Sequence, residues 1–157
     1  MRLYLVRHGE ALDEDEDPKR PLSEKGRGDV ARVAAILDEA GVKIDCVQHS
    51  GKLRAAETAA IMAGSLAVDG TISHRAGIAP NDPVDPILDQ LRSIRQDDGG
   101  GLMLVGHMPH LGRLSSRLLS GEGWVGVTMP EGGVLCLEGL GASWSLVWFI
   151  VPELARR

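Results

Sequence analysis

Two arginines and two histidines in this chain have the types and positions needed for chemistry on a phosphate group. Arg7 and His8 directly follow the apolar residues 3–6, Arg54 follows a small-residue turn after a second apolar segment, and His107 follows a third. A guanidinium can hold two phosphate oxygens at once, and a histidine with a free ring nitrogen can act as a nucleophile near neutral pH. We therefore expect His8 to attack phosphorus in line, while Arg7, Arg54 and a protonated His107 neutralise charge on the oxygens. Because the protein supplies these cations, we expect no metal and no other cofactor.

Three further polar residues have two interpretations each. Ser50 stands in the turn before a helix, where its hydroxyl could donate to phosphate or cap the helix. Asp82 precedes Pro83, a pair typical of a helix N-cap followed by the first helical residue. Arg20 could reach the rim of the phosphate site, or it could pair with the acidic run at 13–17. That run could itself contact a partner with a basic surface or be a solvated loop.

The elements that must position these residues alternate along the chain. Apolar runs of strand length alternate with stripes of helical spacing four times, and the last two strands follow each other without a helix between them. The expected order is a strand at 3–6, a helix after Ser23 to about Gly41, a strand at 42–49, a helix through Leu66, a weak strand at 71–74, a helix from Pro83 to Ile94, a strand at 102–105, a helix from Pro109 to Gly121, and strands at 132–137 and 144–151.

This alternation predicts a three-layer α/β/α sandwich with a mostly parallel central sheet and an antiparallel C-terminal hairpin. Right-handed crossovers place the carboxyl ends of parallel strands at one edge of the sheet, which is where open α/β sheets bind ligands. We therefore expect Arg7, His8, Arg54 and His107 to converge at that edge.

Composition limits the classes of function. The 157 residues are 43% apolar, which suits one domain spanning 1–157 and excludes a disordered chain. A net charge of −5 and 3% aromatic residues argue against nucleic acid as the partner. We see neither a membrane-length apolar run nor a signal peptide, and we expect Cys46 and Cys136 to be reduced core thiols. These features predict a cytoplasmic protein that does not bind membranes.

Four motifs, taken in their order and spacing, resemble the histidine phosphatase superfamily and, within it, the SixA-type phosphohistidine phosphatases. The resemblance implies a phosphoglycerate-mutase-like fold and a nucleophile, His8, that becomes transiently phosphorylated. It also implies that Arg7, Arg54 and His107 form the rest of the phosphate site, for which Ser50 is a further candidate, and that water then releases inorganic phosphate from His8. The motifs are Arg7-His8-Gly9-Glu10, Arg20-Pro21-Leu22-Ser23…Gly26, Ser50…Arg54-Ala55…Glu57-Thr58 and Gly106-His107…Pro109.

The choice of branch depends on a missing segment and a weak acid. Residues 59–79 are too few for the lid of the larger relatives, and an open pocket can admit a phosphorylated side chain of a protein. Asp82 is the candidate general acid, and a weak acid suits a phosphohistidine, whose protonated ring leaves readily. We therefore expect a phosphatase acting on phosphohistidine of a signalling or phosphotransfer protein. The alternatives are a phosphomonoesterase of small phosphorylated metabolites and a non-catalytic phosphate-binding module.

Overall fold

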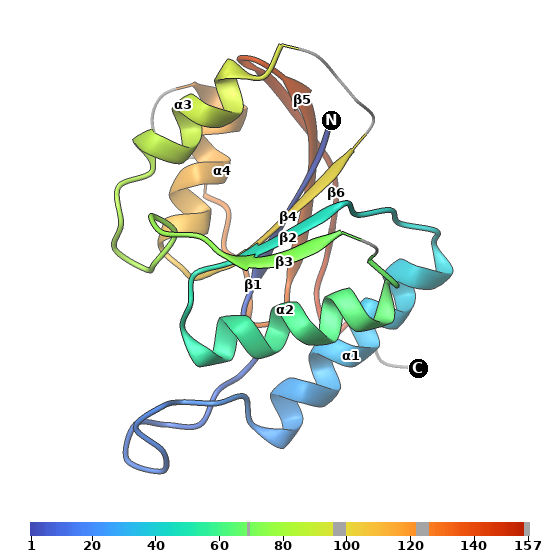
Figure 1. The fold of residues 1–157 in the computed structure, drawn as a ribbon, viewed down its shortest axis with the longest axis vertical. Coiled ribbons are helices and arrows are strands. Elements are labelled where there is room, and N and C mark those ends of the chain that lie inside the picture. Colours follow the sequence, from blue (N-terminus) through green and yellow to red (C-terminus); the bar gives the residue numbers. More distant parts are fainter. Residues whose placement is uncertain (69, 96–99, 122–125, 156–157) are drawn as a thin grey trace.

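A six-stranded mixed sheet forms the middle layer of the molecule, with two helices on each face (Figure 1). The computed structural model describes residues 1–68, 70–95, 100–121 and 126–155. The strands are β1 (Arg2–Arg7), β2 (Cys46–His49), β3 (Thr71–His74), β4 (Gly101–Gly106), β5 (Val134–Leu140) and β6 (Ser143–Ile150), and the helices are α1 (Glu24–Glu39), α2 (Leu53–Ser65), α3 (Asp85–Ser93) and α4 (His110–Ser120).

The strand order β3-β2-β4-β1-β5-β6 confirms the predicted α/β sandwich. β3, β2, β4 and β1 run parallel to one another, and β5 and β6 form the expected antiparallel hairpin. The hairpin joins the sheet because β5 also pairs antiparallel with β1, with Val6 opposite Val134. This register brings the turn before β5 next to the end of β1.

The alternation of side chains along β1 explains why the sheet carries helices on both faces. Leu3 and Leu5 belong to the apolar cluster that includes α3 and α4, whereas Tyr4 and Val6 belong to the cluster that includes α1 and α2. A strand covered on both faces is apolar at successive positions, since its side chains point alternately to either face. β1 is therefore the buried central support for the two residues that follow its apolar run.

Two local predictions are wrong. Helix α3 begins at Asp85 with Val84 as its N-cap, so Asp82 does not cap it. The sequence repeats the Asp-Pro signal, and the helix uses the second pair, in which Pro86 stands in the first turn and needs no N–H partner. Strand β2 is also shorter than predicted, because residues 42–45 form an irregular connection and pairing starts at Cys46.

The segments between the motifs agree with the expected absence of a lid. Between α2 and α3 the described residues form β3 and connecting loops, without an additional helix. No helix within the described ranges has the length and apolar character that crossing a membrane requires. Both cysteines are free, although Cys46 is half-buried and Cys136 alone lies in the core.

Candidate active site

His8 lies just beyond the end of β1 and is almost fully buried, with 6% of its surface exposed. Its Nδ1 is 2.7 Å from the carbonyl oxygen of Gly9, which can only accept a hydrogen bond, so we assign the ring proton to Nδ1. The lone pair is then on Nε2, to which Nε of Arg54 donates at 3.3 Å. The arrangement leaves His8 with one nucleophilic nitrogen that faces an arginine.

His107 follows β4 and packs against His8, with 4.9 Å between the ring centroids. Its Nε2 is 2.6 Å from Oγ of Ser50, which comes from the end of β2. Ser50 is therefore a neighbour of the site; it is not the N-cap of α2, which is Lys52, although its Oγ accepts from the N–H of Lys52 at 3.4 Å. Nδ1 of His107 is buried and has no hydrogen-bond partner among the described residues.

Burial and positive charge keep both rings neutral. The pKa of His8 is lowered to about 4, chiefly by burial and then by the charges of Arg54 and Arg7, against a hydrogen bond to Gly9 that raises it. The pKa of His107 is lowered to about 3 by burial, by His8 and by Arg54. At pH 7 His8 is thus ready to attack as a neutral base. The expected protonated His107 is not found in the protein alone.

Three arginines surround the two histidines. Arg7 donates from NH1 to the carbonyl of Met129 at 2.8 Å, and its NH2 is 3.6 Å from a carboxylate oxygen of Glu131. Arg54 stands in the first turn of α2, and burial lowers its pKa together with the charge of Arg20. The charge of Arg20 also contributes to the lowered pKa of His8. An oxyanion would offset this concentration of positive charge.

Gly9 and Thr58 connect the strand end to α2. The N–H of Gly9 donates to Oγ1 of the fully buried Thr58 at 3.0 Å, and that hydroxyl donates to the carbonyl of Arg54 at 2.7 Å. A Cβ at Gly9 would come within 2.7 Å of Cγ2 of Val30, so glycine permits α1 to approach this closely. These contacts fix the Arg54 main chain relative to the residue that follows His8.

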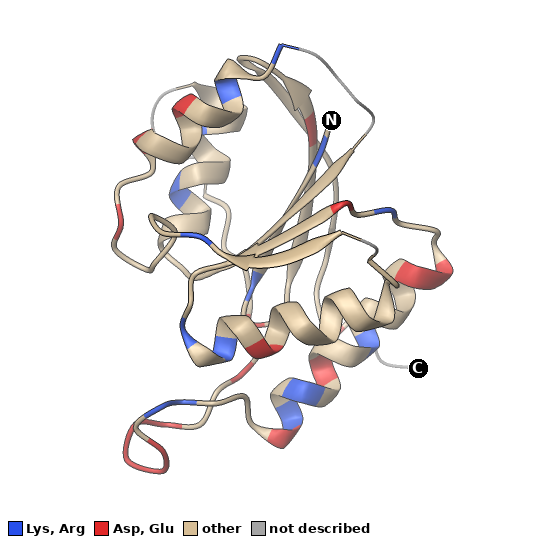
Figure 2. Ribbon diagram, viewed as in Figure 1, with Lys and Arg blue, Asp and Glu red and all other residues tan. Residues whose placement is uncertain are grey.

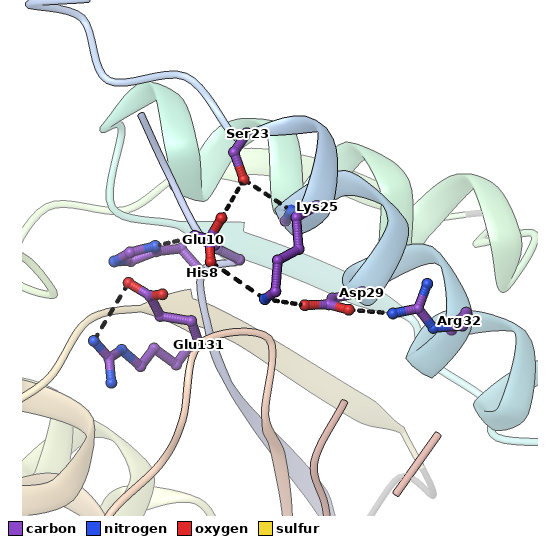
Figure 3. Close-up of polar contacts among 10 residues, drawn as sticks. His8, Glu10, Ser23, Lys25, Asp29, Arg32 and Glu131 are labelled. Atoms are coloured by element: carbon purple, nitrogen blue, oxygen red, sulfur yellow. Dashed lines mark hydrogen bonds and ion pairs between the residues drawn. The ribbon is translucent and has the colours of Figure 1, made fainter. Parts of the chain in front are cut away.

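A second polar network connects the same loop to α1 (Figure 3). Ser23 caps the helix as predicted, because its Oγ accepts from the N–H of Gly26 at 2.9 Å. The same hydroxyl donates to Glu10 at 2.8 Å, and Lys25 lies 3.2 Å from Glu10 and 2.8 Å from Asp29. The buried side of α1 is therefore anchored to the residues directly after His8.

Asp82 is held in its own loop. Its Oδ2 accepts from the N–H of Ala79 at 2.8 Å, and its charge raises the pKa of the buried His110, which burial lowers. His110 in turn contributes to the lowered pKa of His107, so Asp82 affects the site indirectly, through His110. Its role as general acid stays a prediction. The described residues contain no group of three or more His, Cys, Asp or Glu side chains that could hold a metal ion.

Charge outside the site is unevenly distributed (Figure 2). The acidic run at 13–17 forms the tip of the loop after β1 and extends away from the sheet, with residues 13–16 exposed. Arg20, at the base of this loop, donates from Nε to the carbonyl of Leu12 at 3.1 Å. Sequence reasoning missed Glu131, which reaches the site from the turn before β5. The pattern Pro130-Glu131-Gly132-Gly133 marks a turn but does not locate it.

Comparisons with known proteins agree with this fold. Residues 3–77 match the family model described as histidine phosphatase superfamily (branch 1). An uncharacterized protein of Picosynechococcus sp. is 31% identical over 88% of this chain and 85% of its own length. The phosphohistidine phosphatase SixA of Escherichia coli is 27% identical over 78% of this chain and 76% of its own length.

A solved structure of the protein histidine phosphatase SixA complexed with tungstate has the same fold. Its TM-score is 0.86 at 23% identity, covering 99% of this chain and 100% of that chain. The chain belongs to the histidine phosphatase superfamily. It is a phosphatase of that superfamily, similar to SixA.

Proposed function

We propose that this protein hydrolyses phosphohistidine on a partner protein through a covalent phospho-His8 intermediate. The observation that carries the proposal is the neutral His8 ring, whose Nε2 faces Arg54 and lies against His107. Two observations support the choice of substrate. The chain resembles a phosphohistidine phosphatase over most of its length, and the described segment between α2 and α3 adds no helix that would cover the pocket.

The proposed reaction has two displacements at phosphorus. Arg7, Arg54 and Ser50 bind the phosphoryl oxygens, and Nε2 of His8 forms a bond to phosphorus as the bond to the leaving imidazole nitrogen breaks. The leaving ring takes the electron pair, and Nδ1–H of His8 continues to donate to the Gly9 carbonyl. A water molecule then attacks phosphorus in the opposite direction, which returns His8 to its neutral form and releases inorganic phosphate.

The dianionic phosphoryl group also changes the state of His107. Burial and then neighbouring charges hold its pKa at about 3 in the protein alone, whereas an adjacent anion favours the protonated ring. Protonated His107 would then donate to a phosphoryl oxygen, as the sequence led us to expect. We therefore place the proton uptake by His107 at substrate binding.

The test compares phosphate release from a phosphohistidine-bearing protein, a phosphoserine peptide and a sugar phosphate. Wild type, His8→Ala and the matched control His74→Ala are assayed, because His74 is an exposed histidine at the end of edge strand β3. We expect rapid phosphate release from phosphohistidine by wild type. His8→Ala should lose this activity, and His74→Ala should keep it. Wild type that is rapidly mixed with the phosphohistidine substrate and then isolated should also carry acid-labile phosphate on His8.

Other outcomes identify the alternatives. Preference for the sugar phosphate would keep the two-step chemistry and assign the protein to phosphorylated metabolites. Phosphate binding without turnover of any substrate would indicate a non-catalytic binding module. Equal activity in wild type and His8→Ala would contradict the nucleophile.

A further inference from the structure

One carboxylate contacts the cationic site that Arg7, Arg20 and Arg54 form around the two histidines, and it has no part in the chemistry described so far. Oε1 of Glu131 is 3.6 Å from NH2 of Arg7, and its charge raises the pKa of Arg54. The side chain is 37% exposed, so it is accessible to solvent and to a bound substrate. In Figure 3 a dashed line joins Glu131 to the arginine with which it forms this ion pair.

The main chain fixes Glu131 relative to His8. The N–H of Gly132 lies 3.1 Å from the carbonyl oxygen of Arg7 and 3.0 Å from that of His8, so it is shared between them. Arg7 N–H donates to the carbonyl of Gly133 at 3.1 Å. Gly132 has a φ of 76°, which favours glycine at this turn. Movement of the Glu131 main chain would therefore disturb the strand end that carries the nucleophile.

Charged groups from four parts of the fold face this carboxylate. On its other side Glu131 lines a pocket of about 210 Å³ together with side chains of α1 and the C-terminal segment. Lys25 in that pocket is already paired with Glu10 and Asp29, so it does not neutralise Glu131. The facing groups are Arg7 from β1, Arg54 from α2, Lys25 and Asp29 from α1, and Glu153 from the C-terminal segment.

A carboxylate in this position is unfavourable for most phosphate substrates. It competes with phosphate oxygens for Arg7, and it repels the dianion that the pocket binds. It favours a substrate that carries a positive charge next to its phosphoryl group. A phosphohistidine protonated on its second ring nitrogen has such a charge, whereas phosphoserine and sugar phosphates do not.

We infer that Glu131 is a specificity-determining residue that binds the ring N–H of the protonated phosphohistidine. The inference rests on the proposed function. Glu131 stays ionised throughout: His8 Nε2 bonds to phosphorus, the P–N bond breaks, and its electron pair remains on the departing ring. That ring leaves as neutral imidazole with its other N–H still donated to Glu131. An alkoxide leaving group gains nothing, because an ionised carboxylate has no proton to give.

The experiment measures kcat and kcat/KM against pH for a histidine peptide phosphorylated on its ring and for p-nitrophenyl phosphate, whose p-nitrophenolate group leaves without needing a proton. Wild type is compared with E131Q and with E153Q, which removes a carboxylate from the other wall of the same pocket. We expect E131Q to lose about tenfold on phosphohistidine, in line with a partly exposed charge-assisted hydrogen bond. The alkaline limb of its kcat profile, which reports the bound complex, should move to lower pH, because the bound ring loses its proton more readily.

The two substrates and two controls separate the explanations. Turnover of p-nitrophenyl phosphate should be unchanged or higher in E131Q, E153Q should behave as wild type, and E131D should recover part of the phosphohistidine activity. A parallel change on both substrates would show that Glu131 acts only on Arg7 and would overturn the inference. An unchanged pH profile in E131Q would do the same while leaving the proposed function intact. If wild type does not hydrolyse phosphohistidine, both the inference on Glu131 and the proposed function are overturned.

Discussion

Acidification should destabilise this protein through its own active-site histidines. The fold holds His8 at a pKa of about 4, whereas the ordinary value is 6.5. Above pH 6.5 the ring is neutral in both the folded and the unfolded chain. Between these two values the unfolded chain binds a proton that the folded chain refuses, so the free energy of unfolding falls as the pH falls through this window.

The magnitude follows from the difference between the two pKa values. A difference of 6.5 − 4, or 2.5 units, corresponds to a ceiling of about 3 kcal/mol for His8. The shift of His107, to about 3, is larger, but part of it is the repulsion that the two rings share, so the two contributions do not add. We expect the free energy of unfolding to fall by about 3 kcal/mol between about pH 7.5 and pH 4.5, a large fraction of a typical domain's stability.

Urea unfolding followed by the fluorescence of the buried Trp144 measures this effect at the two pH values. His8→Gln removes one titrating ring and relieves His107, so the variant should lose about 2 kcal/mol less than wild type on acidification. Carboxylates common to both proteins cancel in this comparison. If wild type and His8→Gln lose equal stability, burial and arginine charge do not hold His8 neutral, and the assigned state of the nucleophile is wrong.

Three further substitutions test phosphate binding at Ser50, structural support by Thr58 and proton transfer by Asp82. Ser50→Ala removes the 2.6 Å contact with His107 and should weaken inhibition by inorganic phosphate about fivefold with little change in unfolding free energy. Thr58→Val leaves a buried backbone N–H without an acceptor, which should lower the free energy of unfolding by about 1–3 kcal/mol in a urea titration. Asp82→Asn should impair phosphohistidine hydrolysis less than His8→Ala; equal losses at matched folding would contradict this ranking.

The convergence of the strand ends could be predicted from sequence because it depends on regular rules. Apolar runs identify buried parallel strands, and crossover handedness places their carboxyl ends together. The observed distances agree: Arg54 reaches His8 at 3.3 Å, and the rings of His8 and His107 are 4.9 Å apart. The local elements were less certain where a signal occurs twice, as in Asp82-Pro83 and Asp85-Pro86, since helix-start preferences alone do not choose between the pairs, and neither aspartate is the N-cap of α3, which is Val84.

Glu131 could not be predicted for a different reason. Its position depends on the pairing of β5 with β1 and on the register that sets Val6 opposite Val134. A hairpin pattern predicts that β5 and β6 pair, but it does not specify which strand of the sheet the hairpin joins. The protonation of His107 had the same limitation, because it depends on burial and on neighbouring charges brought together by the fold.

The position of Glu131 and the protonation of His107 both depend on the cationic site formed by Arg7, Arg20 and Arg54. In the protein alone, Arg7, Arg20 and Arg54 act on rings that are held neutral, and the partly exposed carboxylate of Glu131 offsets only a fraction of their charge. A bound phosphoryl dianion reverses the local field, which favours a protonated His107 and stabilises the folded chain by mass action. The protonated His107 expected from sequence thus belongs to the complex. The neutral one belongs to the free protein, where a buried cation beside three arginines would oppose folding.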